Sequence, residues 1–287
     1  MKKLFVIICF LSANLFAMAQ YNVQDSLMVV KSHWKTSKFK GKISTKSIHF
    51  NKCELFGANQ SVNIIEIAPN SHYKFDLAYQ TKELISLDSI VKIHQAIAGI
   101  NGNFFDVKNG GSMDFIRSNK EIISVNAIYK SGSRAEHQKS AILINNNKLS
   151  ISQWNGDEKW EFDLKGEDVM LTGPLLRIDN KDAVLANNSF NADRAPRSLI
   201  GIKADGTVLM ICVDGRSIEA EGMTIKEEQD LIRWLGCVNA INLDGGGSST
   251  LFFKKASKSG IINYPSDNKV YDHLGLRKIA NAIILVE

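Results

Sequence analysis

The chain has 287 residues, of which 44% are hydrophobic and 23% are charged, an ordinary composition for a soluble globular protein with a sizeable core. Its formal net charge is +5. The positive charge is spread along the chain instead of gathering in one patch, so the composition argues against a nucleic-acid partner.

The N-terminus has the pattern of a secretory signal peptide over residues 1–19. Met1-Lys2-Lys3 precedes an apolar run over residues 4–16, and Ala17-Met18-Ala19 provides an A-x-A cleavage site. We expect export to the periplasm or the extracellular medium, with cleavage after Ala19. Because no later stretch reaches the length of a transmembrane helix, we expect no membrane span.

Alternating and apolar runs predict strands along the rest of the chain, at residues 62–68, 73–78, 122–128, 141–144, 198–203, 208–213, 240–243 and 279–286. Helices are fewer and are expected over residues 84–97 and 224–235. The second begins with Thr224 and has Glu227 three residues later, a capping box, and Gly236 ends it. We expect an α+β fold, with one strand-rich mixed sheet in a single compact domain. Residues 20–60 are expected to form an N-terminal extension with entry strands, and residues 61–287 the domain.

The cysteines do not indicate a disulfide framework. After the signal peptide only Cys53, Cys212 and Cys237 remain, an odd number without C-x-x-C spacing, although one pair could still bridge. Cys212 and Cys237 lie in apolar surroundings, and we expect both to be buried.

The most informative stretch is residues 241–253, in which an apolar run leads into Asp244, three glycines, Ser248, Ser249 and Thr250 before turning apolar again. Three consecutive glycines allow a ligand to approach the backbone N–H groups closely, and the acid adds a reactive group. The simpler alternative is a hairpin, because Asp-Gly is a strong hairpin signal.

Three other strings combine charged or amide side chains with turn signals. Asn101-Gly102-Asn103-Phe104-Phe105-Asp106 is open to the same hairpin interpretation. Arg194-Ala195-Pro196-Arg197 enters a predicted strand, and Val213-Asp214-Gly215-Arg216 leaves one. Each string alone is a weak signal.

Taken in order, these strings resemble the signatures of the phosphodiester glycosidase family, together with Gly173-Pro174-Leu175-Leu176 and Gly222-Met223-Thr224 followed by Glu227. The similarity covers roughly residues 60–287, and Tyr264-Pro265-Ser266-Asp267 adds to it. Two positions depart from the usual pattern: Asn103 stands where a small residue is common, and Ser198 stands where Thr is common.

The resemblance implies hydrolysis of the glycosidic C–O bond of a sugar 1-phosphodiester of the N-acetylglucosamine type. Arginines suit the phosphodiester charge, and a carboxylate is needed near the anomeric carbon. The candidate catalytic carboxylates are Asp106, Asp214, Glu227 and Asp244. The candidate substrate-binding residues are Asn101, Gly102, Asn103, Phe105, Arg194, Arg197, Arg216, Gly245, Gly246, Gly247, Ser248 and Ser249.

Several alternatives stay open at this level. Glu227 needs no catalytic role if it only caps its helix. The same pocket could belong to an exported carbohydrate-binding protein without turnover, or to a phosphodiesterase that cuts the P–O bond. No cofactor is expected; the six histidines show no close pair of zinc-ligand type, and a calcium or magnesium ion held by Asp side chains has no specific support.

Overall fold

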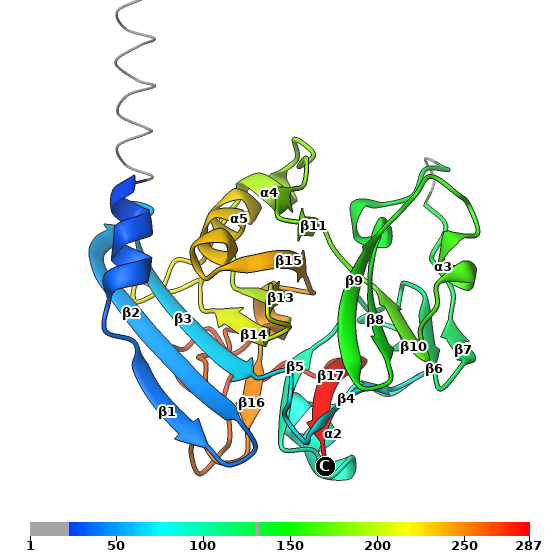
Figure 1. Cartoon of the computed structure of the whole chain (residues 1–287), viewed down its shortest axis with the longest axis horizontal. Helices are drawn as coiled ribbons and strands as arrows, with labels where there is room; N and C mark the ends of the chain where they lie inside the picture. Colours follow the sequence, from blue (N-terminus) through cyan, green and yellow to red (C-terminus); the bar gives the residue numbers. More distant parts are fainter. Residues whose placement is uncertain (1–22, 130–131) are drawn as a thin grey trace, which may run out of the picture.

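The computed structural model describes residues 23–129 and 132–287, and three β-sheets dominate it (Figure 1). The signal peptide predicted over residues 1–19 lies outside the described residues. All strand pairs in the described part of the chain are antiparallel.

The largest sheet has eight strands in the order β1-β2-β3-β14-β13-β15-β11-β12. Their bounds are β1 (Lys35–Phe39), β2 (Ile43–Leu55), β3 (Ala58–Ile67), β14 (Val208–Val213), β13 (Arg197–Lys203), β15 (Cys237–Asn242), β11 (Leu175–Ile178) and β12 (Lys181–Asp182). The segment predicted as an N-terminal extension thus supplies β1, which pairs with β2, and β2, which also pairs with β3.

The other two sheets are smaller. The four-stranded sheet has the order β16-β5-β17-β4 and the five-stranded sheet has the order β7-β6-β10-β8-β9. The first consists of β16 (Leu251–Phe253), β5 (Ala98–Asn101), β17 (Asn281–Val286) and β4 (Lys74–Tyr79), and the second of β7 (Glu121–Ser124), β6 (Ile116–Ser118), β10 (Asp168–Leu171), β8 (Ser140–Asn145) and β9 (Lys148–Gln153).

The helices are short. Residues 23–31 are helical, and the others are α2 (Leu87–Ile93), α3 (Trp160–Asp163), α4 (Ser189–Ala192), α5 (Ile225–Trp234) and the 3₁₀ turns η1 (Glu136–Gln138) and η2 (Gly246–Ser248). Helix α5 begins as predicted, because the Thr224 hydroxyl accepts the Glu227 N–H while the Glu227 carboxylate accepts the Thr224 N–H.

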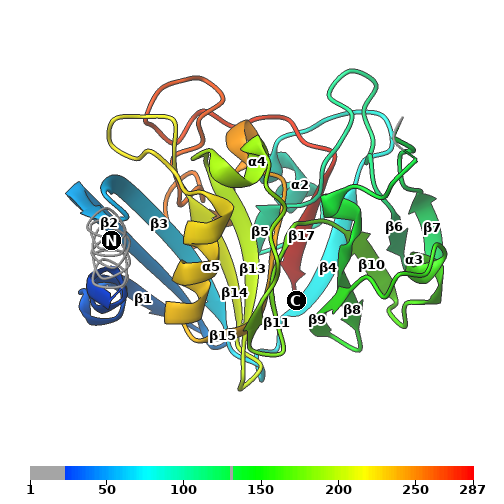
Figure 2. The ribbon, with the colours of Figure 1, turned by 90° about the horizontal axis from the view of Figure 1, so that it is seen from above.

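The layers follow from the alternation of side chains along the strands. Neighbouring residues such as Leu199 and Ile200 point to opposite faces of the eight-stranded sheet. Leu199 packs in the apolar cluster that includes Leu231 and Ile232 of α5, whereas Ile200 packs against the two smaller sheets. Seen from above, α5 lies against one face of the large sheet, and α2 lies on the far side of the four-stranded sheet (Figure 2).

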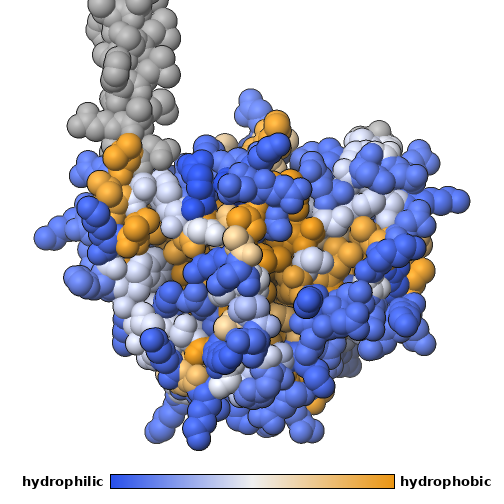
Figure 3. Space-filling model, viewed as in Figure 1, coloured by the Kyte–Doolittle hydropathy of each residue, from blue (hydrophilic) through white to orange (hydrophobic). Residues whose placement is uncertain are grey.

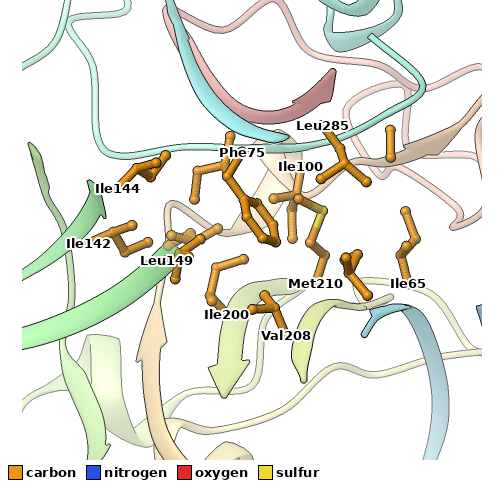
Figure 4. Packing of buried hydrophobic residues seen from close by; sticks show 14 of the residues in the cluster. Ile65, Phe75, Ile100, Ile142, Ile144, Leu149, Ile200, Val208, Met210 and Leu285 are labelled. Atoms are coloured by element: carbon orange, nitrogen blue, oxygen red, sulfur yellow. The ribbon is translucent and has the colours of Figure 1, made fainter. Parts of the chain in front are cut away.

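The central apolar cluster joins all three sheets. Figure 4 shows Ile200 and Met210 of the eight-stranded sheet facing Phe75, Ile100 and side chains of the other two sheets. Residues of this kind stabilise the fold through apolar burial, which removes about 25 cal/mol of unfavourable hydration per Å². On the molecular surface seen in Figure 3, hydrophilic residues predominate, and apolar residues gather between the eight-stranded and five-stranded sheets.

The structure confirms the predicted α+β class with few helices, and it corrects the expectation of one mixed sheet. Three sheets form instead, and every pair of neighbouring strands in them is antiparallel. Helices α2 and α5 each cross over one intervening strand, so the two strands that each helix joins run in the same direction without pairing. Each predicted strand is present, although the one expected over residues 122–128 ends at Ser124. The helix expected over residues 84–97 is only α2, because Gln95 has a positive φ of 53° and ends the helical path.

Among the described residues, no helix is both long enough and apolar enough to cross a membrane. The three described cysteines are free thiols, of which Cys212 and Cys237 are buried as expected and Cys53 is exposed.

We predict that Ile200→Ala lowers the free energy of unfolding by about 2–5 kcal/mol, because it leaves a cavity at a fully buried position where three sheets meet. Urea denaturation monitored by circular dichroism measures this change. The control is Val184→Ala, since Val184 is 97% exposed and its loss should change stability by less than about 0.5 kcal/mol. Equal effects of the two substitutions would contradict this packing.

Candidate functional site

The Gly-rich stretch connects two sheets and is not a hairpin. Strand β15 before it belongs to the eight-stranded sheet and β16 after it belongs to the four-stranded sheet, so residues 243–250 cross from one to the other. Two bonds fix the start of this crossing: the Asp244 N–H donates to the Gly102 carbonyl at 2.9 Å, and Asn101 Nδ2 donates to the Asp244 carbonyl at 2.6 Å. The two predicted motifs therefore meet at one place.

The glycines of this crossing make room for arginines. Gly246 has a φ of 61°, and a Cβ there would lie 2.8 Å from Arg216 Nη2. A Cβ on Gly247 would lie 2.5 Å from Arg277 Nη2. Gly246 needs glycine because of its positive φ, whereas a side chain at Gly247 would displace the flexible ends of Arg277 and Asp267.

Several backbone N–H groups of this turn already donate hydrogen bonds within the protein. The Gly246 N–H donates to the Pro196 carbonyl at 2.8 Å, and the N–H groups of Ser248 and Ser249 bond within the turn. The Gly245 N–H bonds to the Asp244 carboxylate, so Gly247 is the glycine of this turn whose N–H is expected to contact a ligand. The Ser249 hydroxyl is buried and has no hydrogen-bond partner among the described residues.

A cavity of about 400 Å³ opens beside this turn, and we call it the arginine cavity. It brings together five of the predicted site residues: Arg197, Arg216, Asp244, Gly245 and Gly246. Its other lining residues are Ser189, Phe190, Asp193, Ala195 and Arg277. The lining thus combines three arginines with two aspartates, Asp193 and Asp244, of which Asp244 is a predicted catalytic residue.

Asp244 is the predicted catalytic carboxylate that lines this cavity, and its pKa is perturbed. Burial raises the pKa of its carboxyl group from 3.8 to about 6. The Ser248 hydroxyl, the positive charge of Arg277, the Gly245 N–H and the charge of His137 act in the opposite direction. The group is therefore mostly ionised at neutral pH, but it takes up a proton at mildly acidic pH.

The arginines at the cavity mouth are available to a ligand to different degrees. Arg216 is exposed with a φ of 63°, and its guanidinium group has no ion pair or hydrogen bond with any described residue. Arg277 is partly exposed and pairs with Asp267, with an Nη2–Oδ1 distance of 2.6 Å. Arg216 is thus the cation with the greatest capacity to bind an anion.

Arg197 is built into the wall of the cavity. Its Nε donates to the Met223 carbonyl at 2.8 Å, and its Nη2 donates to the carbonyls of Phe190 and Asp193 at 2.9 and 2.8 Å. Its Nε also lies 3.2 Å from Glu228 Oε1. Burial lowers the pKa of Arg197 and raises the pKa of Glu228 to about 8. Most donors of Arg197 are therefore occupied by the protein itself.

Arg194 and Glu227 form an ion pair away from the lining of the cavity. Arg194 Nη2 lies 2.6 Å from Glu227 Oε1, and Glu227 Oε2 accepts the Thr224 N–H at 2.9 Å. Both oxygens of Glu227 are thus engaged at the N-terminus of α5. This placement favours the capping interpretation that the sequence left open.

Asp214 is fully buried and saturated with hydrogen bonds. Its carboxylate accepts from Ser61 Oγ at 2.6 Å, Asn63 Nδ2 at 2.8 Å, Asn263 Nδ2 at 3.1 Å and the Tyr264 N–H at 2.7 Å. Burial raises its pKa against these bonds. The carboxylate ties strand β3 to the segment after β16, and it is not among the lining residues of the arginine cavity.

Asp106 caps its own turn. Its Oδ1 accepts the N–H groups of Asn109 and Lys108 at 2.9 and 2.8 Å, and its Oδ2 accepts Asn109 Nδ2 at 2.8 Å. Hydrogen bonds, led by the Asn109 N–H, lower the pKa of Asp106. This is the behaviour of an Asx turn, and Asp106 does not line the arginine cavity.

The amides of the Asn101–Asp106 string are buried and committed to the fold. Asn103 is 1% exposed, donates to the Leu171 carbonyl at 2.9 Å and accepts from Asn281 Nδ2 at 2.6 Å. A Cβ on Gly102 would lie 2.1 Å from Asn281 Oδ1, so this glycine is needed for close approach. Phe105 packs in the apolar cluster around α2.

Three residues near the site were not predicted from the sequence. Arg277 and Phe190 line the arginine cavity, and Phe190 lies 4.8 Å from the Arg197 guanidinium carbon as a cation–π partner. His137 has its Nδ1 2.6 Å from Asp114 Oδ2, and its ring is 4.7 Å from that of Phe104. The family resemblance included the Tyr264–Asp267 string, and Arg277 follows it in the sequence. This string was the one sequence signal close to Arg277.

No group of three or more His, Cys, Asp or Glu side chains in the described part of the chain is arranged to hold a metal ion. The expectation that the reaction needs no metal stays a prediction.

Comparison with known proteins places this fold and site in context. The phosphodiester glycosidase family model matches residues 94–286. Over 72 residues, 25% of this chain, the sequence is 50% identical to the SPbeta prophage-derived uncharacterized protein YomE of Bacillus subtilis (strain 168). Over a stretch of the same length it is 35% identical to the N-acetylglucosamine-1-phosphodiester alpha-N-acetylglucosaminidase of Mus musculus. These matches span only 11% and 13% of the two relatives' own lengths.

Two solved structures share the fold. The catalytic domain of zebrafish N-acetylglucosamine-1-phosphodiester alpha-N-acetylglucosaminidase has a TM-score of 0.65 at 17% identity, covering 89% of each chain. A hypothetical protein from Synechocystis has a TM-score of 0.64 at 15% identity. The match covers 89% of this chain and 64% of the Synechocystis chain. Since the family model covers most of the chain, the chain belongs to the phosphodiester glycosidase family.

Proposed function

We propose that the protein hydrolyses the glycosidic C–O bond of a sugar 1-phosphodiester, of the N-acetylglucosamine type, in the arginine cavity. The observation that carries this proposal is the juxtaposition of the Asp244 carboxylate with Arg216 and Arg277 in one cavity. A phosphodiester brings one negative charge and a sugar ring brings an electrophilic carbon, so cations and one carboxylate are the groups that the reaction needs.

We assign a role to each charged side chain of the cavity according to how accessible it is to the substrate. Arg216 binds the phosphodiester oxygens, Arg277 adds positive charge beside Asp244, and Arg197 holds the wall in place. Asp244, ionised at neutral pH, attacks the anomeric carbon or activates the water that does so. The C–O bond breaks, its electron pair leaves with the phosphomonoester, and the oxygen of water ends on the sugar.

A single catalytic carboxylate is chemically sufficient here. A phosphomonoester is a far weaker base than a sugar alkoxide, so it leaves without strong help from a general acid. Asp106, Asp214 and Glu227 each have structural partners that account for their presence. We therefore assign the reaction to Asp244 and structural roles to the other three.

The two alternatives make different predictions. A carbohydrate-binding protein gives no turnover, and a phosphodiesterase cuts the P–O bond. Hydrolysis of a panel of sugar 1-phosphodiesters in oxygen-18 water separates all three outcomes. Label in the anomeric hydroxyl supports our proposal, whereas label in the phosphate or the absence of product refutes it.

Export is also part of the proposal, because a signal peptide over residues 1–19 suits an enzyme that acts on glycans outside the cytoplasm. A solved protein with the same fold, from Burkholderia pseudomallei, is described as a putative exported protein; its TM-score is 0.51 at 14% identity, over 80% of this chain and 75% of that chain.

For Asp244→Asn we expect at least a 10³-fold loss of turnover, with substrate binding retained. In the unchanged protein, kcat/KM should fall as the pH drops below about 6, because protonation removes the negative charge of Asp244. Steady-state kinetics from pH 4.5 to 8 test both statements. Full turnover by Asp244→Asn would eliminate this residue as the catalytic group.

The same variant should be more stable than the unchanged protein at pH 7.5. The pKa of Asp244 is higher in the folded chain than in the unfolded one, so the folded state holds the proton more tightly. Stability from this group is therefore present below pH 4 and lost as the pH rises through about 6. Thermal melts at pH 7.5 should show a higher Tm for Asp244→Asn, and the difference should shrink at pH 4.

We predict that Arg216→Ala reduces kcat/KM by about 10²–10³-fold while the Tm stays unchanged or rises. Lys52→Ala is a matched control, since Lys52 is also an exposed cation with a positive φ of 58° but lies on β2. Arg216→Lys should restore only a small part of the activity, because an ammonium group lacks the fork of guanidinium donors. Normal turnover by Arg216→Ala would exclude the proposed phosphate contact.

For Glu227→Ala we predict a loss of about 0.5–2 kcal/mol in stability, with turnover changed less than twofold. The loss comes from the capping box and the Arg194 ion pair. Urea denaturation and kinetics on the same sample measure the two effects. A large drop in turnover without a change in stability would make Glu227 catalytic.

A further inference from the structure

A second cavity of about 580 Å³ lies apart from the arginine cavity and shares no lining residue with it. We call it the β1–β3 cavity. Its lining residues are His33, Lys35, Ser37, Thr45, Ser47, Ile48, His49, Ser61, Asn63, Ala256, Ser257, Ile261, Ile262, Tyr264, Tyr271 and His273. Its volume is within the range of about 300–1,000 Å³ that small-molecule sites occupy.

One wall is a polar face of the three strands at the edge of the large sheet, labelled at the left of Figure 1. Lys35, Ser47 and Asn63 stand directly opposite one another on β1, β2 and β3. His49 and Ser61 form the next such pair, and side chains of the same face recur at every second position. Further along the strands the same face carries apolar side chains that pack in the core. The polar end of this face is therefore separate from the core.

A second wall is a column of three aromatic rings. Tyr264 lies between Tyr271, at 4.0 Å and 9° between ring planes, and His273, at 4.3 Å and 25°. The His273 Nδ1 is 2.6 Å from the Asn263 carbonyl, and the Tyr264 N–H donates to Asp214. The rings are therefore held in place before any ligand binds.

Asp214 also orients both walls of the cavity. Its carboxylate accepts hydrogen bonds from Ser61 and Asn63, which line the cavity, and it anchors the Tyr264 backbone. A fully buried carboxylate with four donors fixes both walls at once. This gives Asp214 a physical role outside the proposed reaction.

Lys35 is the charged side chain of the lining. Three histidines also line the cavity, and no carboxylate does. Rigid aromatic rings suit the flat apolar face of a pyranose, hydroxyl and amide groups suit its hydroxyls, and the lysine suits an acidic substituent.

We propose that the β1–β3 cavity binds a sugar unit that carries an acidic group, as in a uronic-acid glycan. Lys35 pairs with the acid, the outer face of Tyr271 at the end of the aromatic column packs against the ring, and Ser47 and Asn63 contact its hydroxyls. This binding does not depend on the reaction proposed for the arginine cavity.

The test is a titration of the protein with a hexuronic-acid tetrasaccharide and with its neutral hexose counterpart, followed by calorimetry. We expect the acidic probe to bind at least tenfold more tightly than the neutral one. Lys35→Ala should weaken binding of the acidic probe at least tenfold. Lys38→Ala should not, because Lys38 lies on the same strand and is absent from the cavity lining.

Tyr271→Leu provides an independent variant for the aromatic wall and should weaken the acidic probe without changing turnover of a sugar 1-phosphodiester. Circular dichroism confirms that each variant is folded, and Lys35 is exposed enough that its loss leaves the fold intact. Absence of binding, equal affinity for both probes, or binding lost in Arg216→Ala but kept in Lys35→Ala would each overturn the proposal.

Discussion

The side chain of Asn101 is the contact on which the site depends. It is 1% exposed, its Nδ2 donates to the Asp244 carbonyl, and its Oδ1 accepts from Ser198 Oγ at 2.7 Å and from the Thr250 N–H at 3.1 Å. One amide thus joins β5, β13 and both ends of the Gly-rich crossing. Because all of these groups are buried, each would lose a hydrogen bond without water to replace it if the amide were absent.

This anchoring explains why the crossing can hold an unfavourable arrangement of charges. Arg216 and Arg277 lie against consecutive glycines, and Asp244 carries a carboxyl group whose ionised form is disfavoured by burial. This arrangement of charges does not stabilise the fold, so the surrounding structure has to hold these side chains in position. The buried Arg197, held by three carbonyls and by Glu228, provides that rigid wall.

The four acids that looked equivalent in the sequence differ in their surroundings. Asp106 accepts hydrogen bonds from its own turn, Glu227 caps α5, and Asp214 holds β3 to the segment after β16. Only Asp244 faces a cavity with cations. A carboxylate is reactive when its partners leave it accessible and its pKa is shifted toward the working pH, and these properties depend on neighbours distant in sequence.

The chain alone was enough to predict the α+β class, eight of the 17 described strands and the start of α5, because these depend on local periodicity and on the Thr224–Glu227 capping box. It also predicted that the Gly-rich turn, Arg197 and Arg216 belong to one site. Short strands such as β5 and β16 carry too few residues for a pattern, and their pairing involves residues about 150 positions apart. Which acid faces the cavity, that Arg277 joins it, and that Arg197 is a wall and not a free clamp were decided by the tertiary structure, since burial and hydrogen-bond partners exist only once the three sheets pack together.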